Sequence, residues 1–175
     1  CKGHRQRIKF LNLLRKELDL EVSVFGTGIK PITDKLDAIG PFKYHIVLEN
    51  SVVNDYWSEK LSDSYLGLAF PIYHGCPNIN EYFEDDSYLK IDIYRNKKAL
   101  KKIKELISKN YYEKKIKKVE VSRIKVLNEY NIFPYICYII EDIINKRKKA
   151  MNKEKILLLP ESNFISKNKI KKNTE

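Results

Sequence analysis

The residues best placed to do chemistry lie in one segment, residues 49–63, which reads ENSVVNDYWSEKLSD. Its first three residues, Glu49, Asn50 and Ser51, are polar, although they directly follow an apolar run that is typical of a buried strand. Polar groups in such a position need hydrogen-bonding partners, and a ligand is one candidate partner. The segment therefore predicts a binding site at the end of that strand.

Three further residues of this segment, Tyr56, Glu59 and Lys60, are spaced at i, i+3 and i+4. A helix over residues 56–66, capped by residue 54 or 55, would place them on one face of its first turns. Unpaired backbone N–H groups and the positive end of the helix dipole point to the same place. The combination predicts a metal-free cradle for a diphosphate, in which the glutamate accepts hydrogen bonds from sugar hydroxyls. The ordinary alternative, two surface charges and a half-buried ring, stays open on spacing alone.

Alternating strand and helix patterns must position these residues. We expect strands over residues 21–28, 43–49, 69–75 and 88–93. Helices are expected over residues 7–18, 56–66 and 79–83, with a mostly helical chain after residue 93. Strands that alternate with helices indicate α/β units around a parallel sheet. Ligands of such sheets bind at the carboxyl ends of the strands, which is where the polar residues fall.

The net charge of +11 is concentrated in two stretches. Residues 97–125 carry 12 basic and three acidic residues, and residues 145–175 carry ten basic and three acidic residues. Apolar stripes predict amphipathic helices with solvated lysine faces: Leu100, Ile103, Leu106 and Ile107, then Val119, Ile124 and Leu127. Attraction to anionic lipid or phosphates is the functional alternative. Aromatic residues do not interleave with the lysines as base stacking requires, so we expect no nucleic-acid partner.

The composition bounds the protein class. The chain has 175 residues with 43% hydrophobic residues, which suits a folded domain and excludes wholesale disorder. Its three cysteines are far apart and predict reduced thiols rather than a disulfide framework or a zinc site. We expect a piece of a longer protein or a processed product, since the chain starts at Cys1 and its only methionine is Met151.

The run from residue 44 to residue 83 resembles the donor-binding half of family-ten glycosyltransferases, the α-1,3/4-fucosyltransferases. The hallmark of that family is a strand, Glu-Asn-Ser, a Tyr-x-x-Glu-Lys helix start, and a strand that reads Pro-[Val/Ile]-x-x-Gly. These elements occur here in order as residues 49–51, 56–60 and 71–75. The upstream VSVFG, residues 22–26, is similar to the family's Val-x-x-[Tyr/Phe]-Gly strand. The resemblance covers about residues 5–110.

The resemblance implies a Rossmann-like parallel sheet with flanking helices. This would be the C-terminal half of a two-Rossmann-domain (GT-B) glycosyltransferase, followed by a helical C-terminal extension. The expected parts are a GDP-sugar-binding domain over residues 1–130, the extension over residues 131–166, and a basic, disordered tail over residues 167–175.

The resemblance also implies an inverting transfer of fucose from GDP-fucose to a glycan acceptor, with no metal or cofactor in the chemical step. Arg7 and Lys60 would neutralise the diphosphate, and Glu59 would bind hydroxyls of the ribose or the fucose. Asn50 and Tyr56 would complete the donor pocket.

Further candidates for the donor pocket are Gly26, Glu49, Ser51, His74 and Gly75. In the resembling family the turn at Gly26 lies near the nucleotide, and His74 ends a predicted strand. His45 within a strand is read as a core or face residue. Asp85 and Asp86 are read as an acidic turn rather than a metal signature.

No catalytic residue is nominated from this chain. The family's general base lies in the N-terminal, acceptor-side domain, which the chain lacks. Trp57 departs from the small or β-branched residue that the family often has at that position, whereas Ser58 is conservative.

Two alternatives stay open: a donor other than GDP-fucose, and a non-catalytic basic module that binds anionic lipid or nucleic acid. The expected location is the cytoplasm. The basic C-terminal segments would add peripheral contact with an anionic membrane at its inner face.

Overall fold

The computed structural model describes residues 2–18, 21–26 and 28–149. The chain divides into two compact units, residues 1–136 and residues 137–175. Helix α6 (Ile132–Lys149) begins in the first unit and runs into the second. The boundaries expected at residues 130 and 166 remain predictions, and the tail over residues 167–175 lies outside the described residues.

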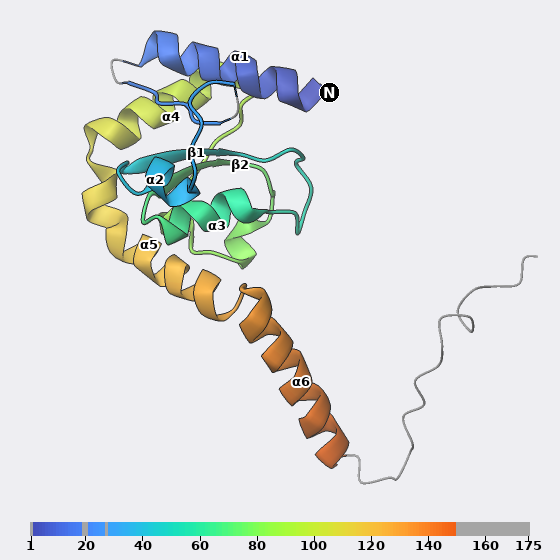
Figure 1. Cartoon of the computed structure of the whole chain (residues 1–175). Helices are drawn as coiled ribbons and strands as arrows, with labels where there is room; N and C mark the ends of the chain where they lie inside the picture. The colour runs from blue at the N-terminus through green and yellow to red at the C-terminus, as the bar shows by residue number, and fades with distance from the viewer. Residues whose placement is uncertain (1, 19–20, 27, 150–175) are drawn as a thin grey trace, which may run out of the picture. The chain divides into compact units, whose positions relative to one another are not determined.

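A parallel sheet of three strands, in the order β1-β2-β3, lies at the centre of the first unit (Figure 1). Its strands are β1 (Tyr44–Leu48), β2 (Phe70–His74) and β3 (Leu89–Lys90). Strand β1 pairs with β2 from Tyr44 opposite Phe70 to Leu48 opposite His74. The carboxyl ends of the two strands therefore lie side by side, which confirms the expected parallel sheet and its two best-marked strands.

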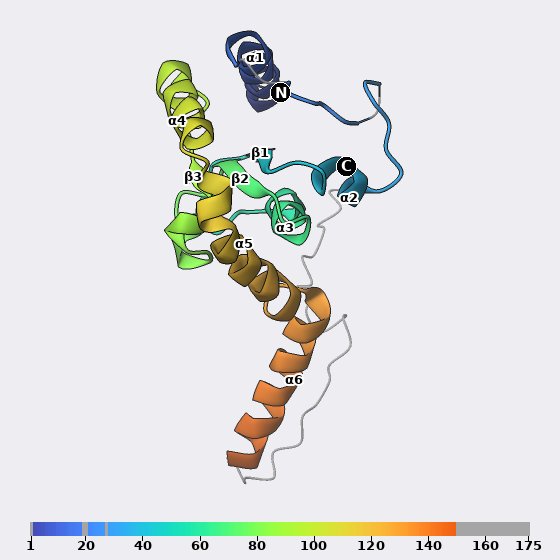
Figure 2. The same cartoon turned by 90° about the vertical axis from the view of Figure 1, so that its left-hand side faces the viewer.

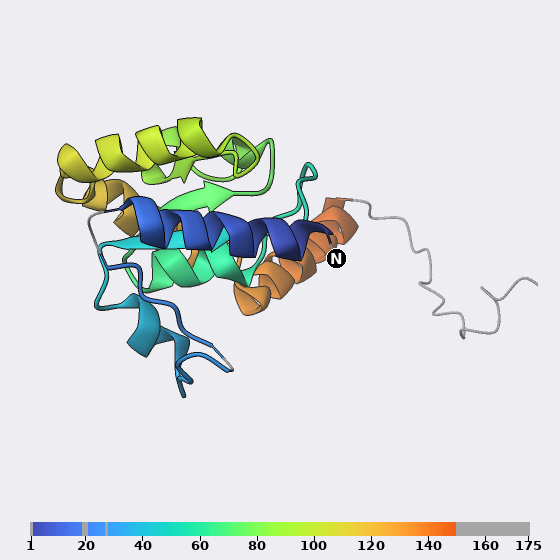
Figure 3. The same ribbon diagram turned by 90° about the horizontal axis from the view of Figure 1, so that it is seen from above.

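Helices cover both faces of this sheet. Helices α1 (Lys2–Glu17) and α4 (Asn96–Ser108) lie on one face, and α3 (Glu59–Leu66) and α5 (Tyr111–Asn128) lie on the other (Figures 1 and 2). Figure 3 shows α1 and α4 running side by side. The short helices are α2 (Lys35–Ile39), η1 (Ile79–Glu81) and η2 (Asp85–Ser87). Layers of helices on both faces bury the apolar surface that a parallel sheet presents on each side.

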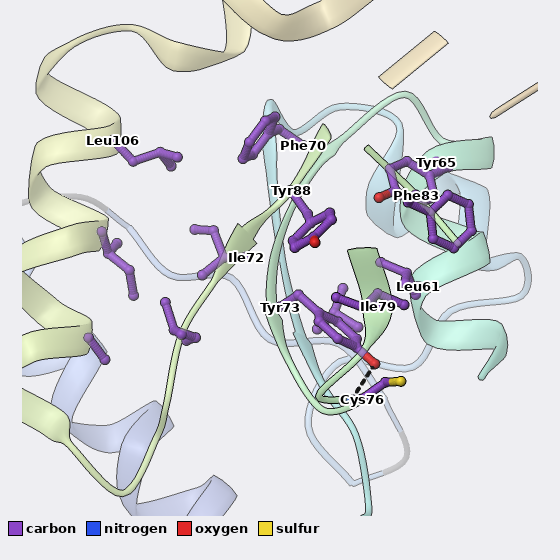
Figure 4. Packing of buried hydrophobic residues seen from close by; sticks show 14 of the residues in the cluster. Leu61, Tyr65, Phe70, Ile72, Tyr73, Cys76, Ile79, Phe83, Tyr88 and Leu106 are labelled. Carbon is purple, nitrogen blue, oxygen red and sulfur yellow. Dashed lines mark hydrogen bonds between the residues drawn. The ribbon is translucent and has the colours of Figure 1, made fainter. Parts of the chain in front are cut away.

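The core is built around β2, whose five residues are all buried. Figure 4 shows Leu61 and Tyr65 of α3 facing the sheet from one side, and Leu106 of α4 facing it from the other. Each fully buried side chain of this kind stabilises the fold by about 1.5–3 kcal/mol. The carboxyl end of β2, where it pairs with β1, is therefore held in place by the packed core.

The strand expected over residues 21–28 is wrong for this structure. Residues 21–25 form no regular secondary structure, and one antiparallel bridge joins Gly26 to Lys30. Gly26 has φ 139° and Gly28 has φ 84°, backbone angles that residues with a side chain rarely adopt. The backbone hydrogen bond from the N–H of Gly26 runs to Lys30 rather than to the edge of β1. The glycines therefore turn the chain back on itself before it can pair with the sheet.

The expected start of the second long helix is also wrong. Helix α3 begins at Glu59, and its cap is Ser58, whose Oγ accepts a hydrogen bond from the N–H of Lys60 (3.4 Å). Asp55 has φ 61°, a left-handed conformation that cannot continue into a helix. Tyr56 therefore lies in the preceding loop and does not share a helix face with Glu59 and Lys60.

The lysine-rich stretch forms two helices, as expected, but the second apolar stripe is placed differently. On α4, Ile103 and Leu106 are buried. On α5 the buried positions are Val119, Ser122 and Val126, whereas Ile124 and Leu127 are exposed. A small serine can lie inside the i, i+3, i+7 face, and a simple search for apolar residues misses it.

Candidate functional site

The candidate site lies at the carboxyl ends of β1 and β2. The strand pairing continues one residue past β1, where the N–H of Glu49 donates to the carbonyl of His74, the last residue of β2 (2.8 Å). The first turns of α1 reach the same place, since a Cβ on Gly3 would lie 3.4 Å from the carbonyl oxygen of Asn50. The site is therefore assembled from α1, the two strand ends and the loop over residues 49–58.

Glu49 organises the start of α3. Its side chain is fully buried, and its carboxylate accepts hydrogen bonds from the backbone N–H (2.9 Å) and the Oγ (2.7 Å) of Ser58. Gly75 leaves the room for it, because a Cβ on Gly75 would lie 2.5 Å from the Cγ of Glu49 and from the hydroxyl of Tyr73. Glu49 and Gly75 thus form the buried part of the site, beneath the start of α3.

Lys60 is held in the first turn of α3. Its Nζ lies 3.0 Å from the Oγ of Ser58, 3.3 Å from Glu59 and 3.5 Å from Glu49. Its side chain is 30% exposed, so the ammonium still reaches the surface. The positive end of the helix dipole lies at the same turn, and both favour an anion there.

Glu59 is exposed beside this lysine. Partial burial by itself would raise the pKa of its carboxyl. The backbone hydrogen bond and the charge of Lys60 outweigh that effect and hold the pKa below its usual value. Glu59 is therefore an ionised hydrogen-bond acceptor at neutral pH, as contact with hydroxyl groups requires.

Arg7 approaches the strand end from α1. It lies on the same helix face as the core residues Phe10 and Leu14, at i, i+3 and i+7, so packing of α1 directs it toward the sheet. Its guanidinium makes two long contacts, 3.4 Å to the carbonyl of Leu48 and 3.5 Å to Nδ1 of His4.

The Nε of Arg7 is buried and has no hydrogen-bond partner among the residues that the structure describes. Across the part of the chain that the structure describes, no carboxylate forms an ion pair with Arg7. A buried donor without a partner costs about 1–3 kcal/mol. An anion bound at this position would satisfy it.

Arg7 and Lys60 face the same cleft, which has a volume of about 910 Å³. Arg7 contacts the carbonyl of Leu48 and Lys60 contacts the carboxylate of Glu49, so the two cations reach adjacent residues of the chain. Gly26 also lines the cleft, on the wall formed by residues 21–26. The arrangement can hold an anionic group between α1 and α3.

The remaining predicted residues have different surroundings. Asn50, Ser51 and Tyr56 are exposed on the loop over residues 49–58. His74 is buried, and its Nδ1–H donates to the carbonyl oxygen of Ile91 (3.2 Å). Of the predicted residues, Arg7, Lys60 and Gly26 therefore line the cleft, Glu59 is exposed next to Lys60, and His74 lies inside the fold.

His45 is hydrogen-bonded to Ser64 within the fold, as expected for a core or face residue. Burial lowers its pKa to about 4, so the ring is neutral at physiological pH. Asp85 and Asp86 are engaged by Tyr88 and Lys115. Among residues 2–18, 21–26 and 28–149, no group of three or more His, Cys, Asp or Glu side chains could hold a metal ion.

The sequence did not predict the contacts that Ser58, Asn78 and Tyr82 make at the site. Ser58 carries a local signal, because serine is a preferred helix cap. Asn78 and Tyr82 hydrogen-bond to Asp55, 23 and 27 residues away along the chain, and no local pattern reveals such contacts.

Residues 1–156 match the family model "Glycosyltransferase family 10 (fucosyltransferase) C-term". The chain is 29% identical over 109 residues to 4-galactosyl-N-acetylglucosaminide 3-alpha-L-fucosyltransferase 9 of Bos taurus, a match that covers 59% of this chain and 30% of that protein. It is 29% identical over 65 residues to Alpha-(1,3)-fucosyltransferase FucT of Helicobacter pylori, covering 37% of this chain and 14% of that protein.

Solved structures share the fold. A crystal structure of an alpha1,3-fucosyltransferase with GDP-fucose aligns with a TM-score of 0.54 and 23% identity, over 65% of this chain and 35% of the other. A crystal structure of an alpha1,3-fucosyltransferase with GDP aligns with a TM-score of 0.52 and 22% identity, over 73% of this chain and 44% of the other. The chain therefore spans less than half of the length of the proteins it matches.

Proposed function

The chain belongs to glycosyltransferase family 10, and from this premise we propose that it binds the donor GDP-fucose for an inverting α-1,3/4-fucosyl transfer to a glycan acceptor. The observation that carries this proposal is the Arg7 guanidinium, which shares a cleft with Lys60 and whose buried Nε has no partner in the described part of the chain. A diphosphate would supply acceptor oxygens for the Arg7 guanidinium and further negative charge beside Lys60, whose Nζ already lies 3.3 Å from Glu59 and 3.5 Å from Glu49.

Two cations at the diphosphate suit the chemistry. Glycosyl transfer passes through an oxocarbenium-like state while negative charge grows on the departing diphosphate. Fixed cations at that position stabilise the transition state more than the ground state. Arg7 would make a bidentate phosphate contact and Lys60 would act as a point charge. We propose that the step needs no metal and no cofactor.

The donor's hydroxyl groups would be bound by the other exposed residues. Glu59 is an ionised acceptor beside Lys60, and Asn50 and Tyr56 extend from the adjacent loop. The general base that deprotonates the acceptor hydroxyl is proposed to lie in an N-terminal domain outside this chain.

The experiment that tests the proposal is a calorimetric titration of the full-length protein with GDP, GDP-fucose and UDP. We expect GDP and GDP-fucose to bind and UDP to bind much more weakly, with at least tenfold loss in Lys60→Ala. Lys118→Ala is the matched control, because Lys118 pairs with Glu84 away from the strand ends and should leave binding unchanged. A preference for UDP would reassign the donor to another sugar nucleotide. No nucleotide binding would refute the proposal.

We also propose a cytoplasmic location with peripheral contact to an anionic membrane through the C-terminal region. In the described residues, no helix is long and apolar enough to cross a membrane. Exposed large apolar side chains lie on α6: Ile132, Phe133, Tyr135, Ile136, Tyr138, Ile139, Ile140, Ile143 and Ile144. The helix ends in the basic run over residues 146–149. Apolar and cationic groups together favour the surface of an anionic bilayer.

Sedimentation with vesicles tests the membrane contact. The protein should sediment with phosphatidylserine-containing vesicles at low salt and much less with pure phosphatidylcholine. Ile140→Asp should abolish sedimentation, whereas Val121→Asp, at an equally exposed position on α5, should not. Equal sedimentation of both variants would contradict the role of α6.

A further inference from the structure

Tyr56 lies between residues that are anchored on both sides. Ahead of it, the carboxylate of Asp55 accepts hydrogen bonds from the hydroxyl of Tyr82 (2.7 Å) and from the side-chain amide of Asn78 (2.7 Å). The backbone N–H of Asp55 donates to the side-chain oxygen of Asn78 (2.9 Å). Three hydrogen bonds therefore tie this residue to the segment that follows β2.

On the C-terminal side of Tyr56 in the sequence, the ring of Trp57 is surrounded by three aromatic residues. Ring centroids lie 5.9 Å from Tyr82, 5.2 Å from Phe83 and 5.1 Å from Tyr130. The interplanar angles of 64°, 75° and 77° are edge-to-face arrangements, which are favourable for aromatic pairs. Tyr82 thus contacts the loop twice, through its hydroxyl at Asp55 and through its ring at Trp57.

The Tyr56 side chain itself is available to bind a ligand. It is 38% exposed, and no residue in the described part of the chain accepts or donates a hydrogen bond at its hydroxyl. Asp55 holds φ 61°, a conformation that costs energy for a residue with a side chain. The surrounding hydrogen bonds over-determine this strained turn, and the turn sets the direction in which Tyr56 leaves the loop.

We propose that Asp55, Asn78 and Tyr82 form a clamp that pre-orients Tyr56 toward the sugar-nucleotide donor, so that these three are positioning residues. The inference rests on the proposed function of the site. A loop that is ordered before binding loses less conformational entropy when the ligand arrives. The clamp therefore acts on donor affinity through Tyr56 and makes no contact with the donor itself.

The protonation states suit the clamp. Hydrogen bonds from Asn78 and Tyr82 lower the pKa of Asp55, so its carboxylate is ionised at neutral pH. The bond to Asp55 raises the pKa of Tyr82 to about 12, so its hydroxyl keeps the proton that it donates. A charged acceptor makes the bond stronger than one between neutral groups.

The test is the affinity for GDP-fucose of the full-length protein carrying Tyr82→Phe. This substitution removes only the hydroxyl and keeps the ring against Trp57. Tyr88→Phe is the matched control, because it deletes an equally short Tyr–Asp bond, 2.7 Å to Asp85, that does not reach the loop. Both variants are also made in a Tyr56→Ala background. A thermal melt of each variant checks that the protein is folded.

We expect Tyr82→Phe to weaken GDP-fucose binding about five- to tenfold, which lies within the range of one typical intramolecular hydrogen bond. In the Tyr56→Ala background the same change should cost less than twofold, because the residue through which it acts is gone. Tyr88→Phe should bind like the wild type.

Two outcomes would overturn the clamp: wild-type affinity in Tyr82→Phe, or an equal loss with and without Tyr56. A wild-type protein that binds no GDP-fucose would refute the clamp together with the proposed function, whereas the first two outcomes leave the proposed function standing.

Discussion

The carboxylate of Glu49 and the cap residue Ser58 are joined by two hydrogen bonds, 2.9 Å from the backbone N–H and 2.7 Å from the Oγ. Glu49 directly follows β1, and Ser58 directly precedes α3. The pair therefore fixes the angle at which α3 leaves the sheet. Lys60 lies 3.0 Å from the same Oγ, so the position of this cation depends on the pair.

Ser58→Ala should affect both stability and binding. It removes the helix cap and one bond to the buried carboxylate, and a lost cap costs about 0.5–2 kcal/mol. The free energy of unfolding, measured by urea denaturation, should fall by about 1–2 kcal/mol, and GDP affinity should fall with it because Lys60 loses a partner. Ser108→Ala removes an exposed hydroxyl bonded to Glu105 and serves as the control. Equal stability of the two variants would contradict this role of Ser58.

Gly75→Ala should destabilise the fold. The added Cβ would lie 2.5 Å from the Cγ of Glu49 and from the hydroxyl of Tyr73, both in the interior. Overpacking of this kind costs about 1–3 kcal/mol. Thermal melting would show the loss, and Gly3→Ala, whose Cβ meets its nearest atom at an ordinary 3.4 Å, should melt close to the wild type. An unchanged melting temperature for Gly75→Ala would contradict this, because it would mean that Glu49 and Tyr73 can move aside without loss of stability.

Arg7→Met should separate function from stability. The substitution keeps an apolar chain on the core-facing side of α1 and removes a buried donor that has no partner. The free energy of unfolding should therefore stay the same or rise, while GDP affinity falls at least tenfold. Urea denaturation measures the free energy of unfolding of this variant, and calorimetry measures its affinity for GDP. A large loss of stability with intact binding would mean that Arg7 serves the fold alone.

Acid should destabilise the protein through His45. Burial lowers the pKa of this ring to about 4 in the folded state, against 6.5 ordinarily. As the pH falls from about 6.5 to about 4, the unfolded state takes up a proton that the folded state does not, so stability declines by about 1–3 kcal/mol. Urea denaturation at pH 7 and pH 4.5 measures the decline. His45→Gln should flatten this part of the pH profile, and an unchanged slope in that variant would assign the effect to other groups.

Much of the fold and of the site follows from local patterns. The β-branched and apolar runs at residues 43–49 and 69–75 predicted β1 and β2, because side-chain type and strand length are local properties. The order Glu-Asn-Ser, Tyr-x-x-Glu-Lys and Pro-Ile-x-x-Gly indicates the family from the sequence alone. The spacing also predicts Lys60 in the first turns of a helix, which is where it lies, although the helix begins at Glu59 rather than at residue 56.

Tertiary structure decided what each of these residues touches. Glu49 faces inward to Ser58, Arg7 reaches the strand end because Phe10 and Leu14 pack α1 onto the core, and Asp55 finds Asn78 and Tyr82 across more than twenty residues of chain. The turn at Gly26 replaces an expected strand because pairing with a distant edge competes with a local bridge. Periodicity in a sequence records which face of an element is apolar, but contacts between distant elements depend on how those faces pack.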